Sequence, residues 1–344
     1  MNISKKKLDD IKRCYATSSI FYEDKIHLIF SSEDPNVICE SFSGDDFGVK
    51  EEIWKEPGGC MSIIPIPGRE KEFLAIQEFY LKVTPSLAKL VWVKKGEKAW
   101  KIKDVLKLPY LHRFDLYKVD DSIYFIGATI ATSKEHKEDW TVPGRIYVGK
   151  LPENLEDGIK VEILKDGLYR NHGYYGDIDE NGNPCGYFGC DNGIYKVYPP
   201  LNRNSDWKIE KILDGVIGEI SVIDIDNDGE KEIMTIEPFH GNQIYIYKKN
   251  NGDWRRVYKY DKEIDFAHSL IAGTLRGIPT FIAGVRREDA ELFYVQFKDG
   301  KFVTEIIEKG VGPANLSLVN EKHRDLILSA NHTANEASVY IVTD

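Results

Sequence analysis

The feature that most constrains the fold of this chain is a pair of short apolar strands that recurs along its whole length. A turn joins the two strands of each pair, as between residues 219–223 and 232–235 and between residues 268–272 and 280–283. The pairs recur at intervals of about 40 to 50 residues, which is typical of repeat folds. Because no helical period accompanies them, they predict an all-β chain. Seven units begin near Tyr15, Gly59, Tyr110, Tyr169, Val216, Ile264 and Val311.

The two ends of the chain predict how the seven units close. The last unit ends with its third strand at residues 339–342, which leaves no room for a fourth. Residues 7–13 precede the first unit and can supply that strand, which removes the free sheet edges of an open arrangement. We therefore predict a seven-bladed β-propeller whose last blade is closed by an N-terminal strand. Because no linker separates the units, residues 1–344 are predicted to form one domain.

The charge and composition of the chain argue against several classes of function. The formal net charge is −10, which disfavours nucleic acid or an anionic membrane as a partner. No apolar run approaches the length of a membrane span, and no apolar segment follows the basic N-terminal residues as in a signal peptide. The five cysteines are odd in number and lack zinc-site spacing. We therefore expect a cytoplasmic protein with reduced thiols.

One turn between two strands carries the pattern of a cation-binding loop. Asp224, Asp226 and Asp228 stand at alternate positions ahead of Gly229, and oxygen ligands in this arrangement suit Ca²⁺. Both flanks are apolar and β-branched, so the loop belongs to a strand hairpin and differs from an EF-hand, which needs helices. The alternative is that the turn only stiffens the hairpin, because Asp and Gly are ordinary turn residues.

Together, the strand before Asp224, the D-x-D-x-D-G turn of residues 224–229 and the strand that begins at Glu232 resemble an FG-GAP (or VCBS) repeat. The resemblance covers about one repeat, and the other units of the chain are degenerate. FG-GAP repeats form β-propellers, so the resemblance implies the same fold as the count of seven units.

A second pattern concerns the side chains that the blades bring to one face. In a four-stranded antiparallel blade, the start of the innermost strand and the turn between the second and third strands lie on the same face. The aligned first positions are Ser18, Met61, His112, His172, Glu219, His268 and Asn315. The second turns add Gln77, Glu78, Thr129, Thr132, Asp191, Asn192, Glu237, His240, Arg286, Arg287, Asn331 and His332. A single histidine is ordinarily a structural residue, but five of the eight in the chain fall on these positions, which favours a functional site.

Two kinds of chemistry fit this histidine face. Neutral imidazoles with one carboxylate suit Zn²⁺ or Mn²⁺ better than Ca²⁺, and we expect Glu219 and His268 to bind such a metal. Imidazole also titrates near neutrality, so His172 and His240 are the expected base and acid, with Arg286 holding a carboxylate. The residues expected to line the substrate site are His112, Asp191, His332, Tyr174 and Asn315. A belt that suits stacking on a sugar ring comprises Tyr80, Tyr174, Tyr175 and Trp140.

This histidine-rich propeller face resembles, in architecture and without a diagnostic motif, the propeller polysaccharide lyases. That group includes enzymes that cleave rhamnose–glucuronate bonds and the oligogalacturonate lyases. The resemblance implies β-elimination from a small uronate-containing oligosaccharide. In that reaction a base removes the C5 proton, while an arginine or a metal stabilises the charge that develops on the carboxylate.

Two other functions remain open. A hydratase or isomerase acting on a keto-sugar would use the same residues. A non-catalytic FG-GAP propeller would instead present one face to a glycan or a protein partner, as integrin-like propellers do. Such a platform has no need for several titratable groups at one channel mouth, so the histidines favour an enzyme. We expect a small acidic saccharide as the partner, and the sequence leaves the oligomeric state open.

Overall fold

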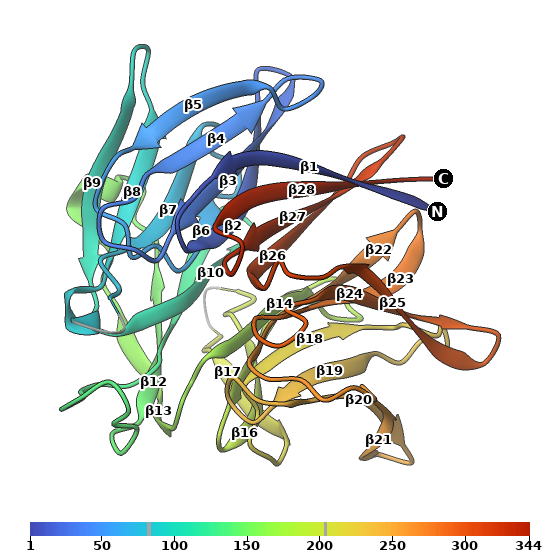
Figure 1. Cartoon of the computed structure of the whole chain (residues 1–344). Helices are drawn as coiled ribbons and strands as arrows, with labels where there is room; N and C mark the ends of the chain where they lie inside the picture. Colours follow the sequence, from blue (N-terminus) through green and yellow to red (C-terminus); the bar gives the residue numbers. More distant parts are fainter. Residues whose placement is uncertain (81–83, 203–204) are drawn as a thin grey trace.

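The strands of this chain are arranged as blades around a central axis (Figure 1). The computed structural model describes residues 1–80, 84–202 and 205–344. Within these residues, 28 strands form seven four-stranded antiparallel sheets. Each innermost strand contacts the innermost strands of both neighbouring blades, so the ring is closed. The chain therefore folds as the predicted all-β, seven-bladed propeller.

The first four blades follow one another along the chain, each starting with its innermost strand. Blade 1 contains β2 (Cys14–Tyr22), β3 (Lys25–Ser32), β4 (Cys39–Ser43) and β5 (Val49–Trp54). Blade 2 contains β6 (Ile63–Pro65), β7 (Glu72–Gln77), β8 (Lys89–Lys95) and β9 (Trp100–Lys107). Blade 3 contains β10 (Leu111–Val119), β11 (Ser122–Thr129), β12 (Gly144–Lys150) and β13 (Glu162–Leu168). Blade 4 contains β14 (Gly173–Ile178), β15 (Pro184–Cys190), β16 (Gly193–Tyr198) and β17 (Lys208–Leu213).

The last three blades continue in the same order. Blade 5 contains β18 (Glu219–Ile223), β19 (Glu232–Glu237), β20 (Gln243–Asn250) and β21 (Asp253–Lys259). Blade 6 contains β22 (Ala267–Leu275), β23 (Ile278–Val285), β24 (Leu292–Lys298) and β25 (Lys301–Glu308). Blade 7 contains β26 (Pro313–Asn320), β27 (Asp325–Asn331), β28 (Glu336–Thr343) and β1 (Asn2–Asp10). The helical segments of the described residues are two single turns, η1 (Pro85–Leu87) and η2 (Leu155–Asp157), and neither is long enough to cross a membrane.

The last blade is closed by the N-terminal strand, as predicted. β1 pairs antiparallel with β28, with Asn2 opposite Thr343 and Asp10 opposite Glu336, so the two ends of the chain lie side by side (Figure 1). The strand begins earlier than the predicted residues 7–13 and ends at Asp10. This pairing joins the ends of the chain in one sheet and leaves no gap in the ring of blades.

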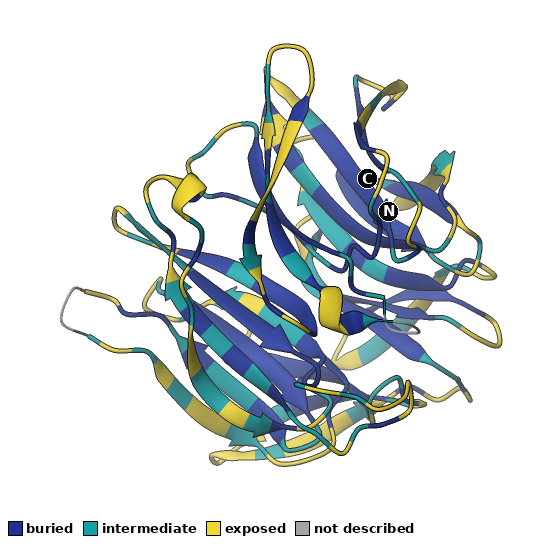
Figure 2. Cartoon of the chain, turned by 90° about the vertical axis from the view of Figure 1, so that its left-hand side faces the viewer, coloured by how far each residue is buried: buried dark blue, intermediate teal, exposed yellow. Residues whose placement is uncertain are grey.

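Burial increases from the outermost strands toward the second strand of each blade (Figure 2). β7, β19 and β27 are buried along their whole length, because neighbouring blades pack against both of their faces. Outermost strands such as β13 and β21 alternate between exposed and partly buried residues. All five cysteines lie within the described residues, buried and without a disulfide bond.

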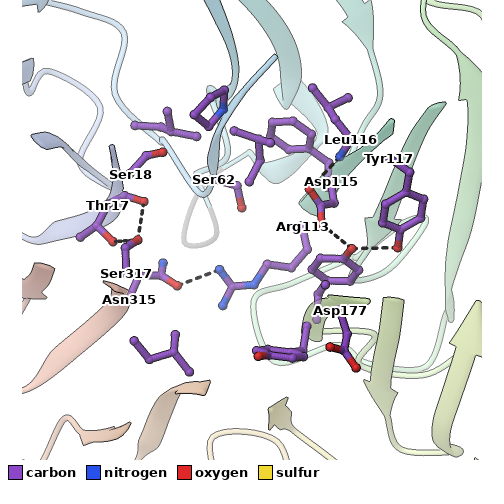
Figure 3. Close-up of a pocket in the computed structure, with 18 of the residues that line it drawn as sticks. Thr17, Ser18, Ser62, Arg113, Asp115, Leu116, Tyr117, Asp177, Asn315 and Ser317 are labelled. Carbon is purple, nitrogen blue, oxygen red and sulfur yellow. Dashed lines mark hydrogen bonds between the residues drawn. The ribbon is translucent and has the colours of Figure 1, made fainter. Parts of the chain in front are cut away.

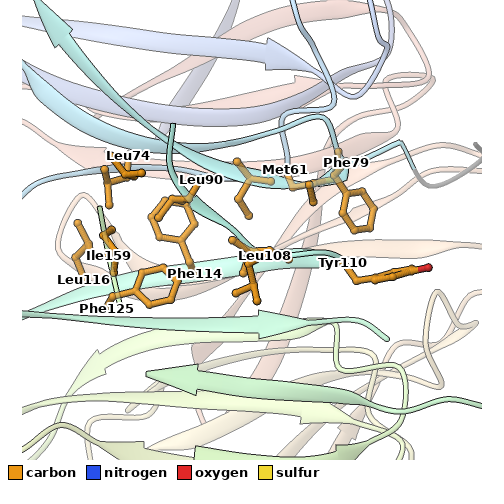
Figure 4. Packing of buried hydrophobic residues seen from close by; sticks show 14 of the residues in the cluster. Met61, Leu74, Phe79, Leu90, Leu108, Tyr110, Phe114, Leu116, Phe125 and Ile159 are labelled. Carbon is orange, nitrogen blue, oxygen red and sulfur yellow. The ribbon is translucent and has the colours of Figure 1, made fainter. Parts of the chain in front are cut away.

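The hydrophobic core lies between blades, and its largest cluster joins blades 2 and 3 (Figure 4). Leu74 and Leu90 of blade 2 pack in one cluster with Phe114 and Phe125 of blade 3. The two phenylalanine rings are stacked with their centroids 6.0 Å apart. Packing of this kind fixes each inner strand against its neighbours and therefore fixes the positions of side chains that point toward the axis.

The starts of the inner strands contain β-bulges, which shift the predicted alignment. An extra residue interrupts the pairing at Tyr15, His112, His268 and Ala314. A bulge leaves one residue outside the ladder and turns its side chain in a new direction, which is common next to functional sites. These four residues therefore mark equivalent positions in blades 1, 3, 6 and 7. In blades 4 and 5, where no bulge occurs, the contact between Nδ1 of His172 and the carbonyl oxygen of Gly218 marks the same level, and Met61 of blade 2 lines the same pocket. The alignment on Ser18, Glu219 and Asn315 was wrong by three, one and one residues.

Candidate functional site

A pocket of about 580 Å³ lies where the inner strands begin, and we call it the histidine pocket. Its lining includes Tyr15, His112, His172, His240, His268, His332, Arg13, Arg286 and Arg287. The structure thus brings together the five histidines that the sequence placed on one face. Three of them, His112, His172 and His268, stand at the equivalent inner-strand positions and are almost completely buried.

Backbone carbonyl groups fix the orientation of two of these rings. The Nδ1 atom of His172 lies 3.0 Å from the carbonyl oxygen of Gly218, and that of His268 lies 2.7 Å from the carbonyl oxygen of Ala314. Each carbonyl belongs to the equivalent position of the next blade. Because a carbonyl oxygen only accepts hydrogen bonds, Nδ1 carries the proton in both rings. In the neutral ring, the lone pair is then on Nε2.

Three histidines converge closely enough to share one metal ion. His172, His240 and His268 each place one ligand atom within 4.8 Å of the other two. The buried Nε2 atoms of His172 and His240 have no hydrogen-bond partner among the described residues. An unpartnered lone pair in a buried polar group needs an explanation, and a bound metal ion is one.

His240 reaches this cluster from the turn after β19. Its φ of 48° lies in the left-handed region, so the backbone is held in an uncommon conformation. Its ring is stacked on Phe239 at 3.7 Å and on Phe266 at 4.4 Å between centroids. The two phenylalanines therefore hold the His240 ring in place beside His268, 4.8 Å away.

Burial keeps the imidazoles of His240 and His268 neutral. It lowers the pKa of His240 and of His268 well below the ordinary value of 6.5, and nearby histidine and arginine side chains lower the pKa further. Neutral imidazole is the form that binds metals. Three imidazoles facing one point fit Zn²⁺, Mn²⁺ or Fe²⁺, because these ions accept nitrogen ligands and leave positions open for a substrate.

One wall of the histidine pocket carries Arg286, which forms no direct ion pair among the described residues and is influenced by the charge of Glu33. Arg286 contacts the ring of His332 at 2.7 Å, and its guanidinium group lies over Phe266 at 4.9 Å. Within the described part of the chain, no carboxylate forms an ion pair with Arg286, whereas Arg287 pairs with Asp265 at 3.1 Å. Burial lowers the pKa of Arg286, but a guanidinium group stays charged at neutral pH. Arg286 is therefore a cation that a ligand can pair with.

His332 lies on this wall and outside the metal cluster. Its Nε2 atom lies 2.7 Å from Oε1 of Glu33, and Glu33 also accepts a hydrogen bond from Arg13. Burial lowers the pKa of His332, while Glu33 acts in the opposite direction. His332 thus links Arg286 to Glu33, which holds the arginine side chain in the pocket.

Tyr15 is a pocket residue that the sequence did not reveal. Its Oη atom lies 3.3 Å from Nε2 of His112 and 3.4 Å from Nε2 of His268. The sequence pattern aligned Ser18 at this level, because a bulge leaves no mark in the alternation of apolar residues. The recognisable signal is the residue type, since a tyrosine placed among histidines can exchange protons with them.

Glu219 lies behind the cluster, on the far side of the His172 ring. Its Oε2 atom is 3.3 Å from Nδ1 of His172 and 3.1 Å from Nη2 of Arg113. The ring therefore separates Glu219 from the point where the three histidines meet. Of the two predicted metal ligands on this face, the structure places His268 in the cluster and Glu219 outside it.

Two other predicted residues line a second pocket, of about 700 Å³, farther along the same strands (Figure 3). We call it the channel pocket. Tyr174 donates a hydrogen bond to Asp115 at 2.6 Å there. Asn315 accepts one from Arg113 at 2.9 Å. Ser18, from the misaligned position in blade 1, also lines this pocket.

The remaining predicted residues lie in the histidine pocket, in the channel pocket or outside both. Trp140 and Tyr80 line the histidine pocket, and Trp140 packs edge-to-face on Phe239 at 5.1 Å. Tyr175 lines the channel pocket. Asp191 pairs with Arg170 and does not line the histidine pocket. Half of the predicted aromatic belt therefore lies beside the histidines, and the Lys134 ammonium group covers one face of the Trp140 ring at 3.1 Å from its centroid.

The Asp-rich turn of blade 5 already contains a positive charge. The Lys248 ammonium group contacts Asp226, lies 2.7 Å from Asp228 and lies 3.0 Å from Glu232. Asp224 instead accepts hydrogen bonds from the backbone amides of Asp228 and Gly229. Asp224, Asp226 and Glu232 are also close enough to share a metal ion.

Comparison with known proteins identifies the fold and no family. No protein-family model matches the sequence, and no curated protein matches it. The Sqt1 structure from Saccharomyces cerevisiae is similar over 100% of this chain and 99% of its own, with 10% identity and a TM-score of 0.59. The β-propeller domain of Cps50 (Swd1) from Myceliophteria thermophila is similar over 99% of this chain and 100% of its own, with 12% identity and a TM-score of 0.63. At these identities, the likeness supports the seven-bladed propeller alone.

Proposed function

We propose that this protein is a metal-dependent lyase that cleaves a small uronate-containing oligosaccharide by β-elimination. The observation that carries the proposal is the convergence of His172, His240 and His268 beside Arg286 in one pocket. The FG-GAP-like turn and the resemblance to propeller lyases agree with it at the level of architecture.

The substrate class follows from the charges and rings of the histidine pocket. Arg286 can form a bidentate pair with a carboxylate, whereas Arg13 and Arg287 at the same mouth are already paired with acidic side chains. Trp140 and Tyr80 present aromatic surface to the same space. A sugar ring that carries a carboxylate matches both features, and the pocket volume is in the range of small-molecule sites.

The three histidines are assigned to a divalent transition metal. When bound, such an ion withdraws charge from the carboxylate of the substrate and makes its C5 proton more acidic. The base and acid roles expected for His172 and His240 become ligand roles in this proposal, because both rings share one point with His268.

Proton transfer is assigned to His112 and Tyr15, which line the pocket next to the cluster. Burial lowers the pKa of His112 and raises that of Tyr15, so a neutral imidazole is the acceptor and a neutral phenol is the donor. His112 takes the C5 proton, the C4–O bond breaks as the C4=C5 double bond forms, and the leaving oxygen takes the proton of Tyr15. The proton then returns from His112 to Tyr15 across their 3.3 Å contact.

The test combines metal analysis with a substrate screen. Purified protein is analysed for transition metals before and after dialysis against a chelator, and acidic disaccharides are screened for the absorbance of an unsaturated uronate. We expect about one metal ion per chain and a product that disappears after dialysis and returns with the metal. A protein that binds no transition metal and forms no unsaturated product would overturn the proposal.

A second candidate is a propeller that binds an acidic glycan without cleaving it. In its favour, Arg286 offers a positive charge in the same pocket as the aromatic side chains of Phe266 and Trp140. These features suffice to bind an acidic sugar without cleaving it. It predicts saccharide binding that survives removal of the metal, and no change in the saccharide after prolonged incubation.

A further inference from the structure

We infer that Glu219 is a positioning residue that holds His172 as a metal ligand and that Arg113 holds Glu219 in turn. The inference rests on the proposed metal centre and adds its outer shell. Metal-binding histidines commonly donate their second N–H to a carboxylate or a carbonyl group, which fixes the ring and increases its basicity.

The contacts of Glu219 show a carboxylate whose acceptor positions are already occupied. Oε1 accepts the backbone N–H of Tyr174 at 3.0 Å, and a longer contact of 3.4 Å comes from Ile220. Oε2 lies between Arg113 at 3.1 Å and Nδ1 of His172 at 3.3 Å. The side chain is 5% exposed, and a buried carboxylate of this kind is stable when it is paired and hydrogen-bonded.

The same group cannot bind the metal directly while it keeps these contacts. Nδ1 and Nε2 lie on opposite sides of the imidazole ring, and the Nε2 side of His172 faces the cluster. Glu219 is therefore separated from the ion by the width of the ring. Its charge acts through Nδ1, where it supplements the hydrogen bond to the carbonyl oxygen of Gly218.

Arg113 connects this carboxylate to the opposite side of the channel. Its Nη1 atom donates to Oδ1 of Asn315 at 2.9 Å, and Asn315 donates through Nδ2 to the carbonyl oxygen of Tyr15 at 2.9 Å. The network thus connects five blades. It runs from Tyr15 in blade 1 to Asn315 in blade 7, Arg113 in blade 3, Glu219 in blade 5 and His172 in blade 4. A network that spans five blades directly below the cluster fixes the relative positions of the ligand-bearing strands.

The test measures metal affinity directly, so it does not depend on knowing the substrate. Zn²⁺ affinity is obtained by competition with a chromophoric chelator, and Co²⁺ loading gives a visible spectrum that reports on the ligand geometry. The variants are Glu219→Gln and the double variant Arg113→Met/Glu219→Gln, which removes both charges together. The matched control is Asp115→Asn, which alters a partly buried carboxylate of the same channel. Asp115 accepts a hydrogen bond from Tyr174 and contacts no histidine among the described residues.

We expect both variants to bind Zn²⁺ about 10- to 100-fold more weakly than the unmodified protein, with a changed Co²⁺ spectrum. The control should bind as the unmodified protein does, and thermal unfolding of each variant shows that it is folded. If the unmodified protein binds the metal and the variants bind it equally well, the inference is overturned and the metal centre stands. If the control is weakened as much as the variants, the effect belongs to channel packing and the inference fails. If the unmodified protein binds neither metal, the centre and its outer shell fail together.

Discussion

The histidine pocket and the Asp-rich turn both bring together side chains that can bind a metal ion. They differ in whether the protein itself supplies partners for those side chains. In the turn, the Lys248 ammonium group lies among Asp226, Asp228 and Glu232, so a cation is supplied by the protein itself. In the histidine cluster the ligand atoms are imidazole nitrogens surrounded by aromatic side chains, and two Nε2 atoms have no partner among the described residues. An acidic cluster can be stabilised by a lysine, whereas the described residues supply neither a cation nor a hydrogen-bond donor for the Nε2 atoms of His172 and His240. The histidine pocket is thus the better candidate for a resident metal.

The largest expected effect comes from removing a ligand of the cluster. His268→Ala and His240→Ala should each weaken transition-metal binding roughly 100-fold or more, because about 10–16 kcal/mol of binding free energy in a four-ligand zinc site corresponds to several kcal/mol per ligand. Metal titration with competition by a chelator measures the change. The control is His136→Ala on the exposed blade 3 loop, with a side chain that is 68% exposed. Unchanged affinity in both cluster variants would remove the distinction between the two regions.

The next effect concerns Arg286, for which the described residues of the histidine pocket supply no ion-pair partner. Arg286→Met should weaken binding of a uronate disaccharide about 10- to 100-fold, since a hydrogen bond to a charged group contributes about 1.5–3 kcal/mol. Calorimetric titration of metal-loaded protein measures it. Arg287→Met is the matched control, because Arg287 is already paired with Asp265 and should matter less. Equal losses in the two variants would mean that net positive charge, and not a specific pair with Arg286, attracts the ligand.

A smaller effect distinguishes the two regions by pH. Burial lowers the folded-state pKa of His112, His240 and His268 below 6.5, so the unfolded chain binds more protons than the folded one below that pH. Stability of the metal-free protein is therefore complete above about pH 6.5 and is lost as the pH falls toward the folded-state values, by about 1.4 kcal/mol per pH unit for each histidine. Lys248 lowers the pKa of Asp228 from 3.8, so the contribution of this carboxylate is lost only at lower pH.

Thermal unfolding between pH 8 and pH 5 in the presence of a chelator checks this prediction. His112→Phe removes one of these three titrating histidines and keeps an aromatic side chain beside Phe79. The melting temperature of this variant should fall less steeply with decreasing pH than that of the unmodified protein. A melting temperature that is constant over this range would show that the rings are not held neutral by burial.

The comparison also shows how far the sequence predicts such a site. The count of seven units and the closure by β1 follow from local patterns, namely apolar strands, turns and a last blade that lacks a strand. The histidines were found because their residue type is rare and five of them share one predicted level. The count of seven units and the group of five histidines can both be recognised even when the alignment contains small errors.

The exact register does not follow from those patterns. A slip of one residue moves a side chain to the other face of a strand, and the bulges at Tyr15 and Ala314 introduce such slips without changing composition. For that reason Tyr15 was missed. Glu219 was expected in the metal cluster because blade 5 was aligned one residue too far along the chain, although β18 pairs with β19 without a register shift. The role of Arg113 was not visible in the sequence, because its contacts with Glu219 and Asn315 join blades that are far apart along the chain.

The smallest expected effect tests whether Lys248 takes the place of a cation. In Lys248→Met, the carboxylates of Asp226 and Glu232 lose their counter-charge and repel each other, so the variant should unfold at a lower temperature than the unmodified protein. Added Ca²⁺ should raise the melting temperature of this variant by a few degrees and leave that of the unmodified protein unchanged, because an ion that binds only the folded state stabilises it by about 2.7 kcal/mol at 100 times its dissociation constant. Lys249→Met, one residue along the same strand, is the control. Equal stabilisation of the unmodified protein by Ca²⁺ would show that the turn binds the ion despite the lysine, and the two regions would then be two metal sites of different chemistry.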